Sequence, residues 1–457
     1  MTESVLPEHR PDAPALNREE LERYAALALD VARTHGADQA EAGSSAESGL
    51  SVSVRHGRVD TLEHHQDRGL AVTVYFGRRK GSASTGDLTE PAVREAVEAA
   101  CAIARFTEED SCHGLADPEL MATEWPDLDL DHPWGVDPDE ATRLAVACEA
   151  AALEADERIT NSEGATVGTQ RSVRVYANSH GFSGTTSSTR HGMHCIAVAG
   201  RGDGMQRDYW YTTGRSAGDL EPPEAVGRRA AERTVRRLGA RPVPTDRVPV
   251  LYDPQAARGL IGHLVGAVSG SKLYRRASFL VDTQGEQLFP DWVHLRERPL
   301  IPRGAASTPF DAEGVATAES DLVRGGVLQR YVLDSYSARR LGLPTTANAG
   351  GIHNLELTPG ELDFDGLVRE MGRGLVVTEL MGQGMNALTG DYSRGASGFW
   401  VEDGAIAHPV EEVTVAGNLR DMFRNLRAAG ADIDRRSNIR TGSILVDGVT
   451  VAGKERS

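Results

Sequence analysis

Residues 374–400 read GLVVTELMGQGMNALTGDYSRGASGFW, and this stretch indicates how the C-terminal half of the chain folds. Short apolar runs alternate with closely spaced glycines, which allow positive φ angles and the close approach of two backbones. Similar short runs, separated by glycine-rich turns, continue from about residue 286 to the end of the chain. The pattern predicts a β-rich C-terminal part.

Polar side chains are interleaved with these glycines, and two interpretations of them remain open. They line a substrate cavity, or they belong to tight β-turns in which neighbouring backbone groups satisfy them. The residue pattern does not decide between the two. The side chains concerned are Thr378, Glu379, Gln383, Asn386, Asp391, Tyr392, Ser393 and Arg394.

Upstream, helical and strand patterns alternate. Asn17 and Glu20 form a potential capping box at the start of an amphipathic helix that Gly36 ends. Strand-like runs follow at 50–55 and 70–76, and a second helix is predicted from Thr89 to about residue 104. These elements predict an N-terminal α/β subdomain of helices and hairpin strands over 17–121, after a disordered tail over 1–16.

An acidic, proline-rich segment at 122–136 predicts a linker. Beyond it, Asp137 and Pro138 begin a predicted helix to about residue 155, followed by strands at 171–178, 183–199 and 205–213 and a helix at 223–238. We read 137–243 as a central α/β subdomain. The remaining residues, 244–457, form the β-rich C-terminal domain with a helix near 254–269. The predicted fold class is α+β.

Charge and composition exclude several classes of function. The net charge of −18 repels phosphate backbones, so we expect no nucleic acid as a partner. No apolar run approaches the ~18–20 residues of a membrane span, so we expect no membrane partner. The N-terminus lacks the pattern of a secretory signal, and the four cysteines show no paired spacing. We therefore expect a cytoplasmic protein.

Standard catalytic motifs are absent from the sequence: there is no dinucleotide-binding loop after a strand, no P-loop, no nucleophile elbow and no HExxH. His191 and His194 precede Cys195, which raises the question of a metal site. In a strand, residues three apart point to opposite faces, so strand-packing or surface histidines are the favoured interpretation.

Several blocks resemble the signature sequences of the TldD/PmbA metallopeptidase family. They are Asn348 to Asn354, Thr378 to Gly384, Thr389 to Ala396, Ala416 to Leu419 and Ile439 to Ser443. The zinc-carrying TldD branch has His-Glu-x-x-x-His on a helix and a zinc-binding cysteine near its C-terminus. Here the aligned positions hold Gly262, His263 and Ala267, and the last cysteine is Cys195. The chain is thus similar to the zinc-less TldE (PmbA) branch.

The resemblance implies a heterodimer in which a TldD-like subunit supplies the zinc and the general base. This chain would hold no metal and no catalytic residue of its own, and it would form part of the cavity for unfolded peptides. Two alternatives remain open. One is a self-sufficient metallopeptidase with an atypical site built from His263, His353 and either Glu379 or Asp311. The other is a non-proteolytic peptide-binding or regulatory protein.

Overall fold

The computed structural model describes residues 17–453 and confirms a mixed α+β fold with a β-rich C-terminal region. The tail predicted over 1–16 lies outside the described residues. The chain divides into two compact units. Unit 1 comprises residues up to 49, 64–114 and 170–188, and unit 2 comprises 50–63, 115–169 and 189 onward. None of the helices between residues 17 and 453 is both long and apolar enough to cross a bilayer.

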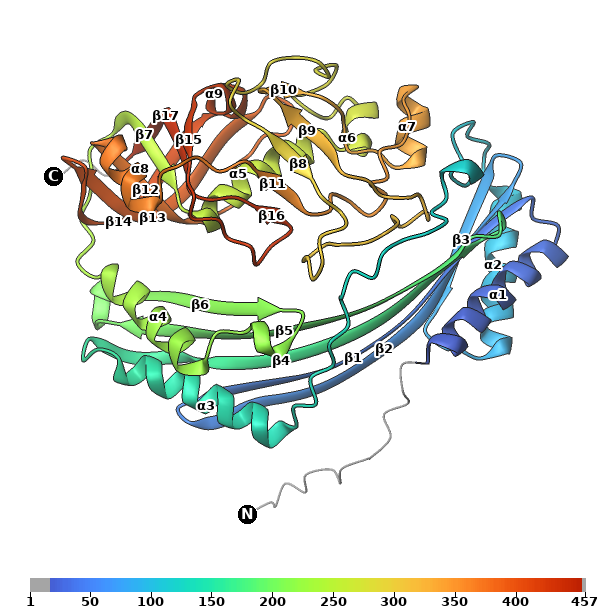
Figure 1. Cartoon of the computed structure of the whole chain (residues 1–457), viewed down its shortest axis with the longest axis horizontal. Coiled ribbons are helices and arrows are strands. Elements are labelled where there is room, and N and C mark those ends of the chain that lie inside the picture. Colours follow the sequence, from blue (N-terminus) through green and yellow to red (C-terminus); the bar gives the residue numbers. More distant parts are fainter. Residues whose placement is uncertain (1–16, 454–457) are drawn as a thin grey trace. The chain divides into compact units, whose positions relative to one another are not determined.

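The elements are labelled in Figure 1. The α-helices are α1 (Arg18–Thr34), α2 (Glu90–Phe106), α3 (Pro138–Glu154), α4 (Pro223–Arg236), α5 (Pro254–Ala267), α6 (Gly270–Tyr274), α7 (Ser335–Leu341), α8 (Phe364–Met371) and α9 (Leu419–Arg424). The strands are β1 (Gln39–Arg55), β2 (Arg58–Phe76), β3 (Arg79–Thr85), β4 (Ile159–Asn178), β5 (Ser183–Ala199), β6 (Gln206–Gly214), β7 (Asp246–Tyr252), β8 (Leu295–Glu297), β9 (Ser320–Arg324), β10 (Val327–Leu328), β11 (Leu355–Leu357), β12 (Gly374–Met381), β13 (Asp391–Glu402), β14 (Ala405–Asn418), β15 (Leu426–Ala429), β16 (Ile439–Arg440) and β17 (Ile444–Ala452).

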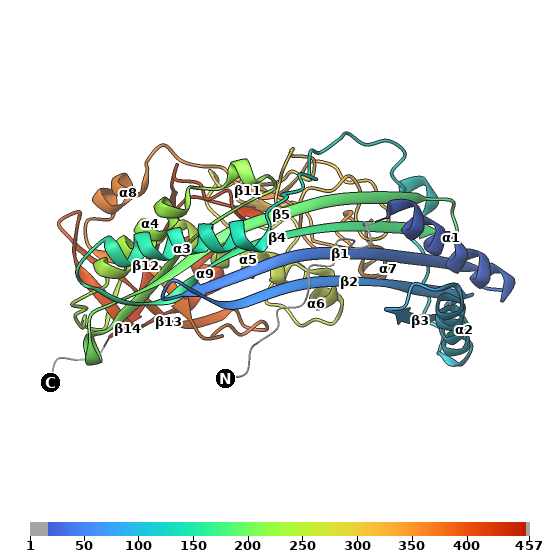
Figure 2. The ribbon, with the colours of Figure 1, turned by 90° about the horizontal axis from the view of Figure 1, so that it is seen from below.

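The first sheet has the strand order β3-β2-β1-β4-β5-β6, and its four central strands run through both units. In unit 1, α1 and α2 pack side by side and share one apolar core with the sheet (Figure 2). Gly81 on β3 is what allows α2 to come close, since a Cβ at this position would lie 2.1 Å from the carbonyl oxygen of Ala100. The Asn17 side chain caps α1 by accepting from the N–H of Glu20, as the sequence predicts.

In unit 2, α3 and α4 pack against the remaining part of this sheet. Asp137 caps α3 by accepting from the N–H of Glu140 at 2.7 Å. The two helices touch at Gly227, where a Cβ would lie 2.0 Å from the carbonyl oxygen of Cys148. Helix contact this close requires a residue without a side chain.

The C-terminal part of unit 2 contains a six-stranded sheet of order β14-β13-β12-β7-β17-β15 and a five-stranded sheet of order β10-β9-β8-β11-β16. The larger sheet is covered on both faces. Along β7, Val250 and Tyr252 point into the core that includes α5, whereas Leu251 points into the core under α8. This alternation follows from the period of two along a strand.

The structure differs from the sequence prediction in two respects. Strands β1, β2 and β4 begin about eleven or twelve residues before the strand patterns at 50, 70 and 171, in stretches rich in small or polar residues that carry little hydrophobic periodicity. The short helices α7, α8 and α9 lie within the region that was predicted as strands and turns. Each spans at most eight residues, too short to establish a helical period in the sequence.

Candidate functional site

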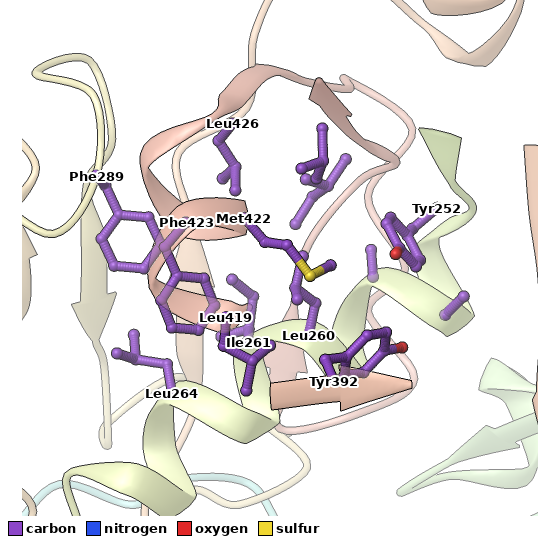
Figure 3. Packing of buried hydrophobic residues seen from close by; sticks show 14 of the residues in the cluster. Tyr252, Leu260, Ile261, Leu264, Phe289, Tyr392, Leu419, Met422, Phe423 and Leu426 are labelled. Atoms are coloured by element: carbon purple, nitrogen blue, oxygen red, sulfur yellow. The ribbon is translucent and has the colours of Figure 1, made fainter. Parts of the chain in front are cut away.

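Helix α5 carries the three positions aligned with the zinc motif. Its N-cap Asp253 accepts a hydrogen bond from the N–H of Ala256 at 2.8 Å, and Pro254 begins the helix. Leu260, Ile261 and Leu264 are buried and fix the helix against the larger C-terminal sheet (Figure 3). These three side chains form the core face of the helix.

The motif positions on α5 do not fit a zinc ion. Gly262 has no side chain, and a Cβ there would meet only the Cδ1 atom of Ile439 at 3.9 Å. Ala267 is buried and ends in a methyl group. A hydrolytic zinc needs about three protein ligands, and neither position offers a donor atom.

His263 lies between these two positions, is partly buried, and has two cationic side chains as neighbours. The centres of the His263 and Tyr392 rings lie 5.7 Å apart in an edge-to-face arrangement, and the Nε2 atom of His263 is buried without a hydrogen-bond partner in the described part of the chain. Burial, then the charges of Arg394 and Lys272, lower the pKa of His263 below its ordinary value. The imidazole is therefore neutral near pH 7, and the neighbouring positive charges would oppose a bound metal cation.

Tyr252, His263, Tyr392 and Arg394 together form what we call the α5 polar cluster. Burial raises the pKa of Tyr392 to about 12 and that of Tyr252 well above its ordinary value, so both phenols stay protonated. Figure 3 shows the two tyrosines at one end of the apolar core. The Tyr252 hydroxyl and the Nε atom of Arg394 are buried without hydrogen-bond partners in residues 17–453. The cluster can hold an acceptor group but has no ionised carboxylate to act as a base.

The predicted cavity residues fall into three groups. Tyr392 and Arg394 belong to the α5 polar cluster. Asn386 and Asp391 are exposed and held in turns: Asn386 accepts from the N–H of Leu388, and Asp391 accepts from the hydroxyl of Thr389. Gln383 and Ser393 are exposed in the same region. Gly384 allows this loop to fold back, since a Cβ there would lie 1.5 Å from the carbonyl oxygen of Ser393.

Thr378 and Glu379 lie on β12 beside a cavity of about 560 Å³ at the N-terminal end of α5. Thr378 lines the cavity, and Glu379 forms an ion pair with Arg237 of 2.7 Å. Burial raises the pKa of Asp253, another lining residue, to about 6. The cavity lies within unit 2. The sequence did not indicate several of its other lining residues: Trp210, Arg229, Arg233, Arg236, Phe364, Phe399 and Arg436.

Three of the four residues considered for an atypical metal site are engaged elsewhere. His353 Nε2 is 2.9 Å from the carbonyl oxygen of Ala347, and Asp311 accepts from the N–H groups of three residues, including Ala349. Glu379 is paired with Arg237. Within residues 17–453, no group of three His, Cys, Asp or Glu residues could hold a metal ion.

His191 is a strand-packing histidine. It is buried on β5 and lies within hydrogen-bond distance of the Thr169 hydroxyl and the carbonyl oxygen of His132, both at 2.9 Å. Burial lowers the pKa of His191, and it also lowers that of His194.

Comparison with known proteins gives consistent matches over nearly the whole chain. Residues 40–104, 131–238 and 245–453 match the first, central and C-terminal domains of the PmbA/TldA metallopeptidases. Metalloprotease PmbA of Escherichia coli O157:H7 is 49% identical over 437 residues, covering 96% of this chain and 97% of the relative. The Haemophilus influenzae PmbA homologue is 47% identical, over 95% and 96% of the two chains.

Solved structures show the same fold. A Bacteroides thetaiotaomicron protein described as a candidate modulator of DNA gyrase superposes with a TM-score of 0.90 at 30% identity, covering 95% of this chain and 99% of that one. TldE from Thermococcus kodakarensis superposes with a TM-score of 0.83 at 22% identity, covering 95% and 100%.

Proposed function

The chain belongs to the PmbA/TldD metallopeptidase family, on its PmbA (TldE) branch, and we propose that it is the non-catalytic subunit of a heterodimeric metalloprotease. A TldD-like partner supplies the zinc ion and the general base. The observation that carries the proposal is the family helix α5 with Gly262 and Ala267 at the ligand positions. A glycine and an alanine supply no donor to a metal.

The electrostatics of α5 support the same assignment. A general base in peptide hydrolysis is a carboxylate or an imidazole within reach of the water it activates. Burial and the positive charges of Arg394 and Lys272 oppose protonation of the His263 imidazole, which makes it a poor proton acceptor. The subunit therefore contributes walls and binding groups, and the bond-breaking chemistry belongs to the partner.

We propose unfolded peptides as the substrates. An extended peptide binds through its backbone when it adds to the edge of a sheet, and such binding is tolerant of sequence. Strand β6 is the edge strand of the first sheet and contributes Asp208 and Trp210 to the cavity beside α5. We also propose the cytoplasm as its compartment, because Cys101, Cys148 and Cys195 are buried free thiols.

The test is co-purification from the native host with a tag on this chain. The proposal expects a sibling with an HExxxH helix at a one-to-one ratio, together with peptidase activity that a chelator removes. Recovery of the chain alone, or of a homodimer that hydrolyses peptides, would refute the heterodimer.

A further inference from the structure

The cavity at the N-terminal end of α5 brings together side chains from seven parts of unit 2. Helix α4 contributes Arg229, Arg233 and Arg236, and the loop before β16 contributes Arg435 and Arg436. Its volume of about 560 Å³ lies in the range of small-molecule sites, ~300–1,000 Å³. The proposed function does not account for this concentration of arginines.

Two of the arginines are neutralised by aspartates of the cavity wall. Arg233 lies 3.4 Å from a carboxylate oxygen of Asp208, and Arg436 forms a two-pronged pair with Asp434 at 2.9 Å. The other two aspartates of the wall are engaged by hydrogen bonds. Asp253 caps α5, and Asp432 accepts from both the N–H and the hydroxyl of Ser443.

Arg229, Arg236 and Arg435 remain without a carboxylate partner among residues 17–453, and all three are exposed. Aromatic rings position two of them: the Arg229 guanidinium lies 3.9 Å from the centre of the Trp210 ring, and that of Arg236 lies 4.9 Å from the centre of the Phe399 ring. Stacking on a ring orients a guanidinium while leaving its N–H donors available to an anion.

Two residues of the cavity wall carry further donors without an acceptor. The Nε2 atom of Gln255 and the Nε atom of Arg233 are buried and have no hydrogen-bond partner in the described part of the chain. A buried donor without a partner costs about 1–3 kcal/mol, so a ligand that supplies acceptor oxygens is favoured here. Phe364 and Phe399 add an apolar surface beside these donors.

We propose that this cavity binds a carboxylate of a peptide, either its C-terminal group or an acidic side chain, through Arg229, Arg236 and Arg435. The apolar part of the same peptide lies against Phe364 and Phe399. The inference rests on the proposed function in taking a peptide as the ligand. It adds a preferred chemical group and the residues that recognise it.

The test measures fluorescence anisotropy of short unstructured peptides with the isolated full-length chain. Three peptides are compared: one with a free C-terminal carboxylate and no acidic residue, its C-terminal amide, and the amide with one internal glutamate. Binding of the free acid assigns the terminal carboxylate, and binding of the glutamate peptide assigns the side chain. Equal binding of all three peptides would overturn the proposal.

The variant Arg229→Gln with Arg236→Gln should weaken binding of the preferred peptide by at least about tenfold, as for loss of charge-assisted hydrogen bonds. Arg228→Gln is the matched control: Arg228 is exposed on the same helix, one residue away, and does not line the cavity. If the double variant fails to fold, Arg435→Gln on the loop replaces it. Unchanged binding in a folded variant would refute the proposal.

Because this measurement needs no partner subunit, its result is separate from that of the co-purification. Tight, carboxylate-dependent binding together with no zinc-carrying partner would retain the cavity assignment and remove the heterodimer. A zinc-carrying partner together with no carboxylate preference would retain the heterodimer and remove the cavity assignment.

Discussion

At position 263 a histidine occupies the place of the general base, yet its surroundings oppose protonation of the ring. Burial and two neighbouring cations lower its pKa, and its contact is the edge of Tyr392. The sequence showed that Gly262 and Ala267 lack donor atoms. It did not show that Arg394, more than a hundred residues away, lies beside the imidazole, because that contact depends on the pairing of β12 with β13 and of β12 with β7.

His263→Phe should keep the ring contact with Tyr392 while removing the unpartnered nitrogen. In the complex with the zinc subunit, we expect kcat/KM for a peptide to stay within about threefold of wild type, whereas removal of a general base costs on the order of 100-fold or more. His263→Ala should lower the free energy of unfolding by about 1–3 kcal/mol through the cavity it leaves. A 100-fold loss of kcat/KM in a folded His263→Phe complex would make His263 a catalytic residue.

The carboxyl group of Glu313 should make the free energy of unfolding depend on pH. Burial raises its pKa from 4.5 to about 7, and its Oε2 atom accepts from the N–H of Ser335. The folded state therefore holds this proton up to about pH 7, whereas the unfolded chain releases it near its ordinary value. Ionisation of Glu313 therefore lowers the free energy of unfolding of the wild type as the pH rises between these two pKa values. The loss reaches its full size above the folded-state pKa.

Glu313→Gln keeps an acceptor for Ser335 and removes the titration. Denaturant unfolding should show that the free energy of unfolding of the variant, relative to wild type, increases by up to about 3 kcal/mol as the pH rises from about 4.5 to 8. Glu361→Gln, at an exposed position, is the control and should show no such trend. A pH-independent difference between Glu313→Gln and wild type would contradict the burial argument.

At the scale of single elements, the sequence predicted the helices of fourteen or more residues, which have an apolar period. Asn17, Asp137 and Asp253 cap α1, α3 and α5, and each side chain accepts a backbone N–H as its position predicts. Strand stretches rich in small or polar residues, and helices of eight residues or fewer, gave no comparable signal. The arginines of α4 gave no sequence signal for a binding site. Arg233 and Arg237 do pair with Asp208, but Arg229, Arg233 and Arg236 also line the cavity, which only the tertiary arrangement reveals.

Two helical glycines provide a matched pair of substitutions. Gly227→Ala places a methyl group against the backbone of α3, 2.0 Å from the carbonyl oxygen of Cys148, and should destabilise by about 1–3 kcal/mol. Gly259→Ala on α5 meets nothing within 4 Å and should stabilise by roughly 0.5–1 kcal/mol through helix propensity. Thermal unfolding of both variants measures the difference, and effects of the same sign would contradict the close contact of α3 with α4.

For the whole molecule, the sequence predicted the α+β class and the family, since signature blocks and apolar periods are local features. The cavity and the α5 polar cluster required the structure, because each combines residues from distant parts of the chain. Zinc binding requires side-chain donor atoms, and Gly262 and Ala267, at the ligand positions of α5, supply none.

The zinc content of the separated subunits tests most directly whether this chain is the zinc-less subunit. It is measured by mass spectrometry after the native complex has been purified and dissociated. We expect about one zinc ion per HExxxH subunit and none retained by this chain, because α5 offers no ligand set. Stoichiometric zinc bound by this chain alone, and lost on His263→Ala, would contradict it.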